Sequence, residues 1–581
     1  MTDPNENALW GRVIVEELLA SGIDAVCVAP GSRSTPLTVA VAQHPEMRVY
    51  SHLDERAAAY FALGRARRTG RPTPLICTSG TAAANFHPAV IEASQSRVPM
   101  VLLTADRPRE LHDSGANQTI DQEKLYGDAV RQYRTLPEPA AQTRRLRSLR
   151  TTICRSVETA TATPAGPVHL NVPMSKPLEP TPVEGAVPEN LIERDPVAVT
   201  GRDGPMVRTT HGTLTPDEAT VERVADTLAP HDRGLIVTGP ANAPVPDRES
   251  LAALSDATGF PVLADPLSGH RFGEHVVDRP ICGGYDSYLD ADGWPVPDVV
   301  VRFGASPTSK TLRHWLRDSG ARQFVVDPAG EWREAEFHAT DLLVADPTAT
   351  ATAVAARLDE SRTDWTARFV DAERRYWDLV ADATDEQFFE GSVAATVAET
   401  VPDPSTLFVS NSMPIRDLDR FGRPREADVR VLGNRGASGI DGITSTALGA
   451  GSGTDDPLVL LTGDLAYYHD MNGLLAVGRC DVDATIVLVN NDGGGIFHKL
   501  PIESFDPPFT QQFRTPHGLD FEPTSALYDL DYEPVEDRET LAETVASSVE
   551  SDGTQLIECQ FDSERSHRHR EQVHDRVTAS R

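Results

Sequence analysis

The sequence predicts an α/β fold with three doubly wound parallel sheets side by side. Apolar runs of four to six residues recur along the 581-residue chain, and helix-like stretches separate them. These runs do not alternate with polar residues, which is typical of parallel strands covered on both faces. The chain is also too long for a single hydrophobic core. Several α/β domains are therefore expected.

The first predicted domain spans residues 1–190. It opens with a helix (NALWGRVIVEELLASG) and a strand (DAVCVAP) that runs into a Gly/Ser turn. Strands are then predicted at RVYSHL, PLICTS, VPMVLLTAD and PVHLNVP, and helices at DERAAAYFALGRARRTG and GTAAANFHPAVIEASQS. This order indicates βαβ units. The Pro- and Gly-rich stretch TPVEGAVPENLIERDPVAVTGRDGPM that follows is predicted to be a linker.

The second and third predicted domains span residues 215–360 and 385–581. The second contains five strand-like runs, GLIVTGP, PVLADP, VVVRFG, QFVVDP and DLLVAD. The helix TDWTARFVDAERRYWDLV separates it from the third, whose strands are TLFVSN, VRVLGN, LVLLTGD, ATIVLVNN and TQLIECQ. The tail SERSHRHREQVHDR is expected to form a solvated helix rather than a metal site.

The charge balance indicates a protein adapted to a high-salt cytoplasm. There are 54 basic and 87 acidic residues, a net charge of −33, and only four lysines: Lys124, Lys176, Lys310 and Lys499. At about 1 M salt the Debye length is ~3 Å, so dispersed surface acids repel each other little. Nucleic-acid binding is disfavoured because no basic stripe is present. Anionic substrates would need specific arginines.

Other sequence features narrow the class of protein. No apolar run reaches the roughly 18 residues that a membrane span needs, and the start lacks a signal-peptide pattern, so a cytoplasmic protein is expected. The six cysteines are scattered without a CxxC pair. Buried, reduced thiols are therefore predicted rather than zinc ligands.

Two polar positions end successive apolar strands in the third domain. Asp464 follows LVLLTG, a helix is predicted over about 466–479, and the next strand ends in Asn490, Asn491, Asp492 and Gly493. Both strand ends lie at the carboxyl edge of a sheet, where open α/β sheets bind ligands. A carboxylate, an amide oxygen and a backbone carbonyl suit Mg²⁺ bridging phosphates. A lone Asp at this place could instead cap a helix, but the pair and the glycines after it favour a metal site.

These residues resemble the thiamine-diphosphate motif, which runs from GD(G) through a helix to NN. The resemblance is to the decarboxylase and acetolactate-synthase type and extends to SHLDERAAAYFALGRARRTGRP, where Glu55 opens a helix after a short strand. It implies that Glu55 is the catalytic carboxyl, hydrogen-bonded to the aminopyrimidine ring so that the cofactor can deprotonate its own C2 atom. It also implies Mg²⁺ or Mn²⁺ held by Asp464, Asn491 and Gly493.

More specific motifs occur along the chain: APGSRSTPL, LTADRPRELHDSGANQTIDQ, FGASPTSKTLRHW, SNSMPIRDLDRF, GNRGASGIDG, GDL in place of GDG, and NNDGGGIFHKLP. Together they resemble one family, the 2-succinyl-5-enolpyruvyl-6-hydroxy-3-cyclohexene-1-carboxylate synthases of menaquinone biosynthesis. With the acidic composition, the resemblance suggests a halophilic archaeal source. It implies a ThDP-dependent transferase that decarboxylates 2-oxoglutarate and adds the succinyl carbanion equivalent to isochorismate. At least a homodimer is implied, with a homotetramer expected.

The resemblance also assigns roles to residues by motif position. Carboxylates of the two dianionic substrates suit the guanidinium fork of arginine. The isochorismate side would comprise Ser32, Arg33, Arg107, Gln118 and Lys310, and the succinyl side Ser412, Arg416 and Arg435. Ser412, Ile440 and Leu465 would also contact the cofactor, Ile440 as the apolar wedge that keeps it bent. Ile496, Phe497 and Leu500 would wall the site and exclude water.

One position departs from the family pattern, and two other functions stay open. The family often has a second basic residue after the lysine, where this chain has Thr311, with Arg313 as a possible substitute. The nearest alternative is another ThDP carboligase of the acetolactate-synthase group, which would have GDG and an FAD-binding middle domain. The other alternative is a non-catalytic nucleotide-binding or scaffold protein. Such a protein would tolerate loss of Glu55 or Asn491, yet both are present. It is also disfavoured because no GxGxxG or GxxxxGK[ST] motif follows a first strand.

Overall fold

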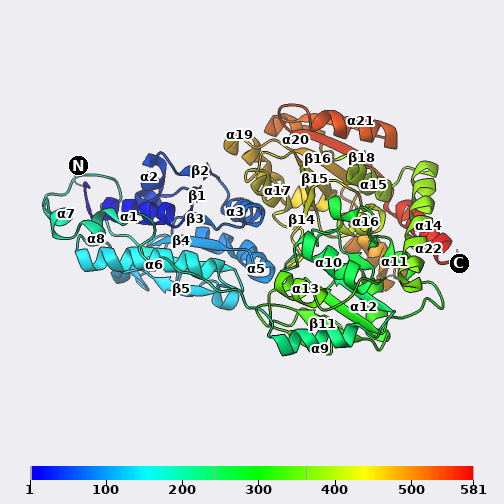
Figure 1. The fold of residues 1–581 in the computed structure, drawn as a ribbon. Helices are drawn as coiled ribbons and strands as arrows, with labels where there is room; N and C mark the ends of the chain where they lie inside the picture. Colours follow the sequence, from blue (N-terminus) through cyan, green and yellow to red (C-terminus); the bar gives the residue numbers. More distant parts are fainter. Residues whose placement is uncertain (1–2, 243, 362, 580–581) are drawn as a thin grey trace. The chain divides into compact units, whose positions relative to one another are not determined.

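The fold contains three parallel sheets, as the sequence predicts, and each sheet has six strands rather than the five that the sequence indicates (Figure 1). A computed structural model describes residues 3–242, 244–361 and 363–579. These form two compact units. The first unit contains residues 1–211, 436–455 and 470–482, and the second contains 212–435, 456–469 and 483–581. The first unit therefore includes two segments that lie within the third predicted domain in sequence.

The first unit contains one sheet, in the order β2-β1-β3-β4-β6-β5. Its strands are β1 (Ala25–Ala29), β2 (Arg48–Ser51), β3 (Thr73–Cys77), β4 (Met100–Asp106), β5 (Gln132–Thr135) and β6 (Pro167–Pro173). Its helices are α1 (Glu6–Ala20), α2 (Thr35–Gln43), α3 (Glu55–Thr69), α4 (Thr81–Asn85), α5 (His87–Ser96), α6 (Thr143–Thr161), α7 (Leu191–Arg194), α8 (Pro196–Thr200), α17 (Ile443–Gly451) and α19 (Leu475–Cys480). Every residue of β1, β3, β4 and β6 is buried, which explains why these strands are apolar without alternation.

The second unit contains two sheets, in the orders β12-β11-β10-β7-β8-β9 and β14-β13-β15-β16-β18-β17. The first of these comprises β7 (Gly234–Thr238), β8 (Val262–Ala264), β9 (Ile281–Cys282), β10 (Val299–Phe303), β11 (Arg322–Val326) and β12 (Asp341–Leu343). The other comprises β13 (Ser405–Val409), β14 (Val429–Leu432), β15 (Leu458–Gly463), β16 (Thr485–Asn490), β17 (Asp531–Pro534) and β18 (Gln555–Gln560).

The helices of the second unit connect these strands and join the two sheets. They are α9 (Glu218–Leu228), α10 (Arg248–Thr258), α11 (Tyr285–Tyr288), α12 (Lys310–Asp318), α13 (Pro347–Ala355), α14 (Asp364–Glu386), α15 (Glu390–Thr400), α16 (Met413–Phe421), α18 (Asp464–His469), α20 (Glu522–Tyr528), α21 (Arg538–Ser548) and α22 (Ser563–Ala579). One buried link is Arg271, whose guanidinium donates to the Asp419 carboxylate at 2.9 Å. This charge pair ties the loop after β8 to α16.

Two expectations from the sequence are wrong in detail. The predicted linker contains α7 and α8, and Leu191, Ala198 and Val199 are buried because they pack in the apolar core of the first unit. Arg150 on α6 also donates to the Ala198 and Val199 carbonyls. The C-terminal tail is a helix, α22, but it is not simply solvated. Arg570 is buried, and its guanidinium donates to Asp417 at 2.7 and 2.6 Å.

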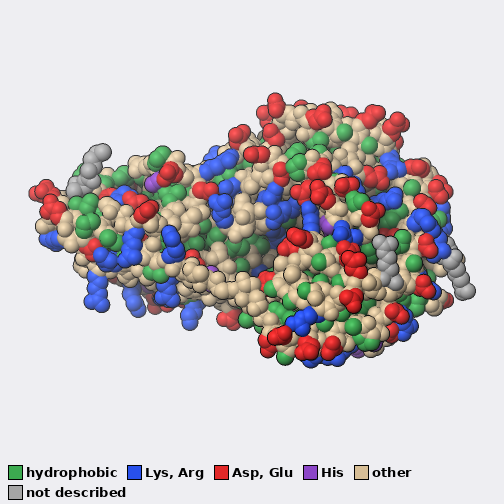
Figure 2. All heavy atoms as spheres, in the orientation of Figure 1, with side chains coloured by type: hydrophobic (Ala, Val, Ile, Leu, Met, Phe, Trp, Pro, Cys, Tyr) green, Lys and Arg blue, Asp and Glu red, His purple; other side chains and the backbone are tan. Residues whose placement is uncertain are grey.

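The surface and the cysteines agree with the composition. Asp and Glu side chains are scattered over the visible face rather than gathered in one block (Figure 2). All six cysteines are buried and free. Among the described residues, no helix has the length and apolar character needed to cross a bilayer.

Helices α3 and α17 pack closely through small residues within the first unit. A Cβ added to Gly64 on α3 would lie 1.8 Å from the Thr446 carbonyl oxygen, and one added to Gly449 on α17 would lie 2.0 Å from the Phe61 carbonyl oxygen. Glycine at these two positions therefore sets the distance between the helices. Overpacking of a close contact costs roughly 1–3 kcal/mol.

We therefore expect Gly64→Ala to lower the thermal unfolding midpoint of the protein, since the two helices must separate. Gly478→Ala is the matched control, because nothing lies within 4 Å of a Cβ added there in α19. Circular dichroism melts in the same high-salt buffer would compare both variants with the parent. An unchanged midpoint for Gly64→Ala would contradict the close packing.

Candidate functional site

Asp464 lies at the carboxyl end of β15, where the sequence predicts a metal ligand. Only 3% of its surface is exposed, and no Lys or Arg of the described residues lies within 4.0 Å of its carboxylate. Its Oδ2 accepts hydrogen bonds from the amides of Asn491 (3.2 Å) and Gly493 (2.9 Å) and from His517 Nε2 (3.1 Å). Burial raises the pKa of Asp464. Among the described residues, the Leu465 amide is the one donor to Oδ1, so this atom retains a lone pair for a cation.

Asn491 follows β16 and lies beside Asp464, as the spacing predicts. Its Nδ2 donates to Glu390 Oε1 at 3.0 Å, whereas its Oδ1 is buried without a hydrogen-bond partner among the described residues. Glu390 is in turn held by Arg570, which also pairs with Asp417. This network fixes the amide so that its oxygen, not its nitrogen, is presented at the site. An orphaned buried oxygen is costly unless a ligand satisfies it.

Gly493 completes the predicted ligand set. Its φ of 135° and the 2.0 Å distance from an added Cβ to the Arg514 carbonyl oxygen both require glycine. No group of three or more His, Cys, Asp or Glu side chains among the described residues could hold a metal ion. A site here would instead use one carboxylate, one amide oxygen and one carbonyl, which fits Mg²⁺ that keeps water and bridges phosphates. The residues present therefore fit the predicted ion and diphosphate.

Glu55 begins α3 in the first unit. The preceding Asp54 caps the helix, accepting the amides of Arg56 and Ala57, so Glu55 does not serve as the cap. The side chain is half-buried near the carboxyl end of β3, where its charge adds to the effect of burial in raising the pKa of the Cys77 thiol. A carboxyl group at the carboxyl edge of a parallel sheet is well placed to contact a ligand.

Four predicted substrate residues of the first unit lie in the loops that follow β1 and β4. Arg33 is buried, and its guanidinium donates to the Met174 carbonyl. Its backbone amide donates to Thr78 Oγ1, so the residue is fixed in place. Burial and the charge of Arg107 lower the pKa of Arg33. Gln118 donates to the Ser79 carbonyl at 3.1 Å, while Ser32 is exposed. Two guanidinium groups close enough for the charge of Arg107 to act on Arg33 indicate a site for an anion.

A second pair of arginines occurs in the second unit. Arg416, on the first turn of α16, donates to the carbonyl of Ser412, which has a φ of 72°. Burial and the charge of Arg435 lower the pKa of Arg416. Arg435 is oriented by Asn411 Oδ1 at 2.9 Å. This pair also favours an anion, as the prediction for a succinyl carboxylate requires.

Three other predicted residues line one cavity of about 650 Å³ in the second unit, together with Arg416. They are Lys310 at the start of α12 and Ile496 and Leu500 at the loop after β16. Phe497 is not among the residues that line this cavity, because its ring packs on Phe513 with centroids 5.4 Å apart. The cavity therefore combines cationic groups with an apolar wall.

Ile440 belongs to a loop that is anchored to α3 and α5 within the first unit. Tyr60 donates to Asp441 Oδ2 at 2.5 Å, and the buried Glu92 carboxylate accepts the amides of Gly436 (2.9 Å) and Ala437 (2.6 Å). Ile440 itself is half-buried. The loop is thus held rigidly enough to present an apolar side chain, which is what the wedge role requires.

Some residues of the site are not apparent from the sequence. His517 contacts Asp464, and Glu390 and Arg570 orient Asn491, yet all three lie outside any motif. Lys499 lines the cavity with Lys310. The one sequence signal for Lys499 is that it is among four lysines in the chain and lies within a matched motif.

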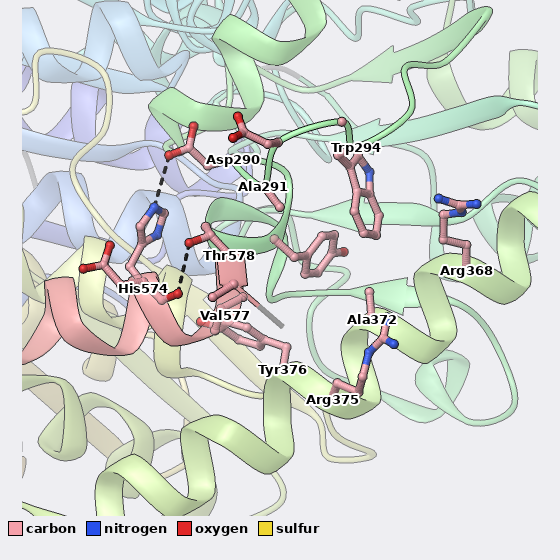
Figure 3. Close-up of a pocket in the computed structure, with 15 residues that line it drawn as sticks. Asp290, Ala291, Trp294, Arg368, Ala372, Arg375, Tyr376, His574, Val577 and Thr578 are labelled. Carbon is pink, nitrogen blue, oxygen red and sulfur yellow. Dashed lines mark hydrogen bonds and ion pairs between the residues drawn. The ribbon is translucent and has the colours of Figure 1, made fainter. Parts of the chain in front are cut away.

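A larger cavity of about 920 Å³ lies elsewhere in the second unit, between α14, α22 and the loop after α11 (Figure 3). The side chains that line it include two arginines, Arg368 and Arg375, and two aspartates, Asp292 and Asp575. In the same cavity, His574 Nε2 is bonded to Asp290 at 3.1 Å. This mixture of charges gives no preference for a ligand of either sign.

Comparisons with known families define the class of protein. Residues 10–125 match the thiamine pyrophosphate enzyme N-terminal TPP binding domain, residues 215–409 the middle domain of thiamine pyrophosphate enzymes, and residues 425–559 the C-terminal TPP binding domain. With three six-stranded parallel sheets, the fold and these matches are those of a thiamine-diphosphate enzyme.

Similar proteins narrow this class. A 2-succinyl-5-enolpyruvyl-6-hydroxy-3-cyclohexene-1-carboxylate synthase from Haloarcula marismortui is 63% identical over 99% of both chains. A protein of the same name from Natronomonas pharaonis is 60% identical over 99% of both chains. Another from Roseiflexus castenholzii is 47% identical over 96% of this chain and 97% of its own. The chain belongs to the 2-succinyl-5-enolpyruvyl-6-hydroxy-3-cyclohexene-1-carboxylate synthase family. The haloarchaeal relatives agree with the acidic composition.

Proposed function

We propose that this chain decarboxylates 2-oxoglutarate and adds the remaining four-carbon unit to isochorismate by conjugate addition, with release of CO₂. The observation that carries the proposal is the presence of two arginine pairs, Arg33 with Arg107 and Arg416 with Arg435, in a protein of net charge −33. Both substrates are dianions, and guanidinium groups bind carboxylates through two parallel hydrogen bonds. The names of the relatives agree with this choice.

Thiamine diphosphate, when bound, supplies the nucleophilic carbon and accepts the electron pair that CO₂ leaves behind. Glu55 would hold a proton at the aminopyrimidine ring nitrogen. Asp464, Asn491 and the Gly493 carbonyl would hold Mg²⁺ or Mn²⁺ against the diphosphate, with Leu465 and Ser412 close to the cofactor. Ile440 would be the apolar wedge that contacts the cofactor.

The remaining predicted residues would bind and shield the substrates. Ser32, Arg33, Arg107, Gln118 and Lys310 would bind isochorismate, and Ser412, Arg416 and Arg435 the succinyl group. Ile496, Phe497 and Leu500 would keep water from the reacting carbon. Fixed arginine charge at the carboxylates needs no reorganisation during the reaction, which favours catalysis.

The assembly is part of this proposal. The three domains would span 1–190, 215–360 and 385–581, and the site would form between the first domain of one subunit and the third domain of another. A homodimer is then the smallest active form, with a homotetramer as the expected one. A cytoplasmic location would supply both substrates.

The test is an assay of purified protein in high salt with ThDP and Mg²⁺. We expect CO₂ release from 2-oxoglutarate that depends on ThDP and is coupled to adduct formation with isochorismate, measured by a coupled CO₂ assay and mass spectrometry. Turnover of pyruvate at the same rate without isochorismate would favour the acetolactate-synthase alternative. Absence of any ThDP-dependent turnover would reject the proposal.

A further inference from the structure

The cavity of about 650 Å³ that contains Lys310 has a second lysine on its wall. Lys499 ends the short helical turn Gly495–Lys499 after β16, between Ile496 and Leu500, which also line the cavity. Lys310 and Thr311 contribute from the start of α12. Two of the four lysines in the chain thus border the same space, although they are 189 positions apart (499 − 310 = 189).

Most charged groups around this cavity already have a partner of opposite charge. Arg420 donates to Asp286 at 2.6 Å, and Arg317 to Asp318 at 2.7 Å. Asp419 is paired with Arg271 outside the cavity wall. Within each pair the positive and negative charges compensate each other, so these groups offer little net charge to a ligand.

Arg313 belongs to the same compensated group. Its Nη1 lies 3.1 Å from Glu336 Oε1, so its charge is directed to that carboxylate. The sequence suggests Arg313 as a substitute for the basic residue that Thr311 replaces. The ion pair with Glu336 makes Arg313 a poor substitute, since a substrate carboxylate would have to compete with a fixed protein carboxylate.

Lys310, Arg416 and Lys499 differ from these groups. Among the described residues, no carboxylate oxygen lies within 4.0 Å of the charged nitrogens of these three side chains. They therefore provide three uncompensated positive charges around one cavity with an apolar wall formed by Ile496 and Leu500. A ligand with more than one carboxylate and an apolar ring or chain matches this arrangement.

We propose that Lys499 is a substrate-binding residue that contacts a carboxylate of isochorismate together with Lys310, and so supplies the positive charge that Thr311 lacks. This inference rests on the proposed function, because it assigns a residue to that reaction. Lysine delivers its charge as a point donor on a flexible stem, so it can reach a carboxylate from a loop as well as from a helix.

The surroundings of Lys499 agree with a role in anion binding. Although much of the Lys499 side chain is exposed, desolvation of its amine within the cavity and the charge of Arg420 lower the pKa of Lys499 to about 8, and Asp286, Glu571 and Asp417 act in the opposite direction. A bound carboxylate would favour the charged form of this amine. The lysine is thus more easily neutralised in the free protein than an ordinary surface lysine.

The test compares the steady-state kinetics of Lys499→Met and Lys499→Arg with the parent protein. We expect Lys499→Met to raise the KM for isochorismate roughly tenfold, about the worth of one charge-assisted hydrogen bond, and to leave the KM for 2-oxoglutarate within about twofold. Lys499→Arg keeps the charge and should recover most of the loss. The assays belong in at least 1 M KCl, where a Debye length of about 3 Å restricts the effect to direct contact.

Two further measurements separate binding from a structural effect. Lys499→Met with Thr311→Lys restores a cation on the same cavity wall and should lower the KM for isochorismate again. In the parent, kcat/KM for isochorismate should fall as the pH rises above about 8, because Lys499 loses its charge, and Lys499→Arg should not show this fall. Lys176→Met, at an exposed lysine of the first unit, is the control and should change neither KM.

An unchanged KM for isochorismate in Lys499→Met, or an equal rise for both substrates, would overturn the assignment while the parent enzyme remains active. Absence of ThDP-dependent turnover in the parent would instead reject the proposed function, and this inference with it. The two failures are therefore distinguishable in a single set of assays.

Discussion

Glu55→Gln is expected to bind thiamine diphosphate nearly as well as the parent protein but to lower kcat by roughly a hundred- to ten-thousandfold, the usual contribution of a positioned acid–base group. Glutamine preserves the size of the side chain at the first position of α3, but it cannot exchange a proton with the aminopyrimidine ring. Cofactor affinity would be measured by titration calorimetry, and kcat by CO₂ release.

Asp54→Asn is the matched control for this variant. Asp54 is the adjacent carboxylate, and it caps α3 by accepting the amides of Arg56 and Ala57, a role that asparagine performs equally well. We expect its kcat to stay within about threefold of the parent. A near-normal kcat for Glu55→Gln would remove Glu55 from the catalytic role, and a large loss in Asp54→Asn would show that any carboxylate change at this helix start disturbs the site.

The central strands of each sheet could be predicted from sequence, whereas one edge strand of each sheet could not. β5, β9 and β17 all lie at an edge, and each is short. β5 and β17 are largely exposed, so they need no apolar run. A strand whose pairing comes from one neighbour and whose side chains face water carries little periodic signal. The predicted linker has the same explanation, because its buried positions are too few to form a pattern.

The polar groups at strand ends could be predicted because they follow apolar runs at fixed spacing. Asp464 and Asn491 lie together as expected, since parallel strands β15 and β16 end at the same edge. The residues that orient them could not be predicted in this way. Glu390 contacts Asn491 from 101 positions away (491 − 390), and Arg570, 79 positions away (570 − 491), holds Glu390; the two residues lie on helices that only the tertiary fold brings together. No local pattern encodes such a contact.

Asp464→Asn should abolish the Mg²⁺-dependent part of thiamine diphosphate binding while leaving the fold intact. Loss of a group that only orients a metal ligand typically lowers affinity ten- to a hundredfold, so loss of a ligand charge should lower it by about a hundredfold or more. Asparagine keeps one acceptor oxygen, which can still accept the Leu465 amide at the Oδ1 position, but its Nδ2 cannot accept the amides that bind Oδ2 of Asp464. The measurement is the dissociation constant of the cofactor at saturating Mg²⁺.

Thermal unfolding then distinguishes loss of the metal from loss of structure. The Asp464 carboxylate is buried without a Lys or Arg partner among the described residues, and a buried charge without such a partner destabilises a fold. Without ligands, Asp464→Asn removes this charge but also loses the amide hydrogen bonds to Oδ2, so the two effects oppose each other and the variant should unfold close to the temperature of the parent. Addition of ThDP and Mg²⁺ should raise the midpoint of the parent but not that of the variant, because a ligand stabilises only the state it binds.

Asp492→Asn provides the comparison for both measurements. Asp492 is the nearest carboxylate in the same loop, but it is partly exposed and accepts the amides of His517 and Gly518, so its charge is not needed for a metal. It should retain the stabilisation by ThDP and Mg²⁺. If Asp464→Asn kept that stabilisation as well, Asp464 would not be a metal ligand. If the unfolding midpoint of ligand-free Asp464→Asn fell sharply, the Asp464 carboxylate would stabilise the loop rather than bind the cation, since removal of a buried charge alone would raise the midpoint.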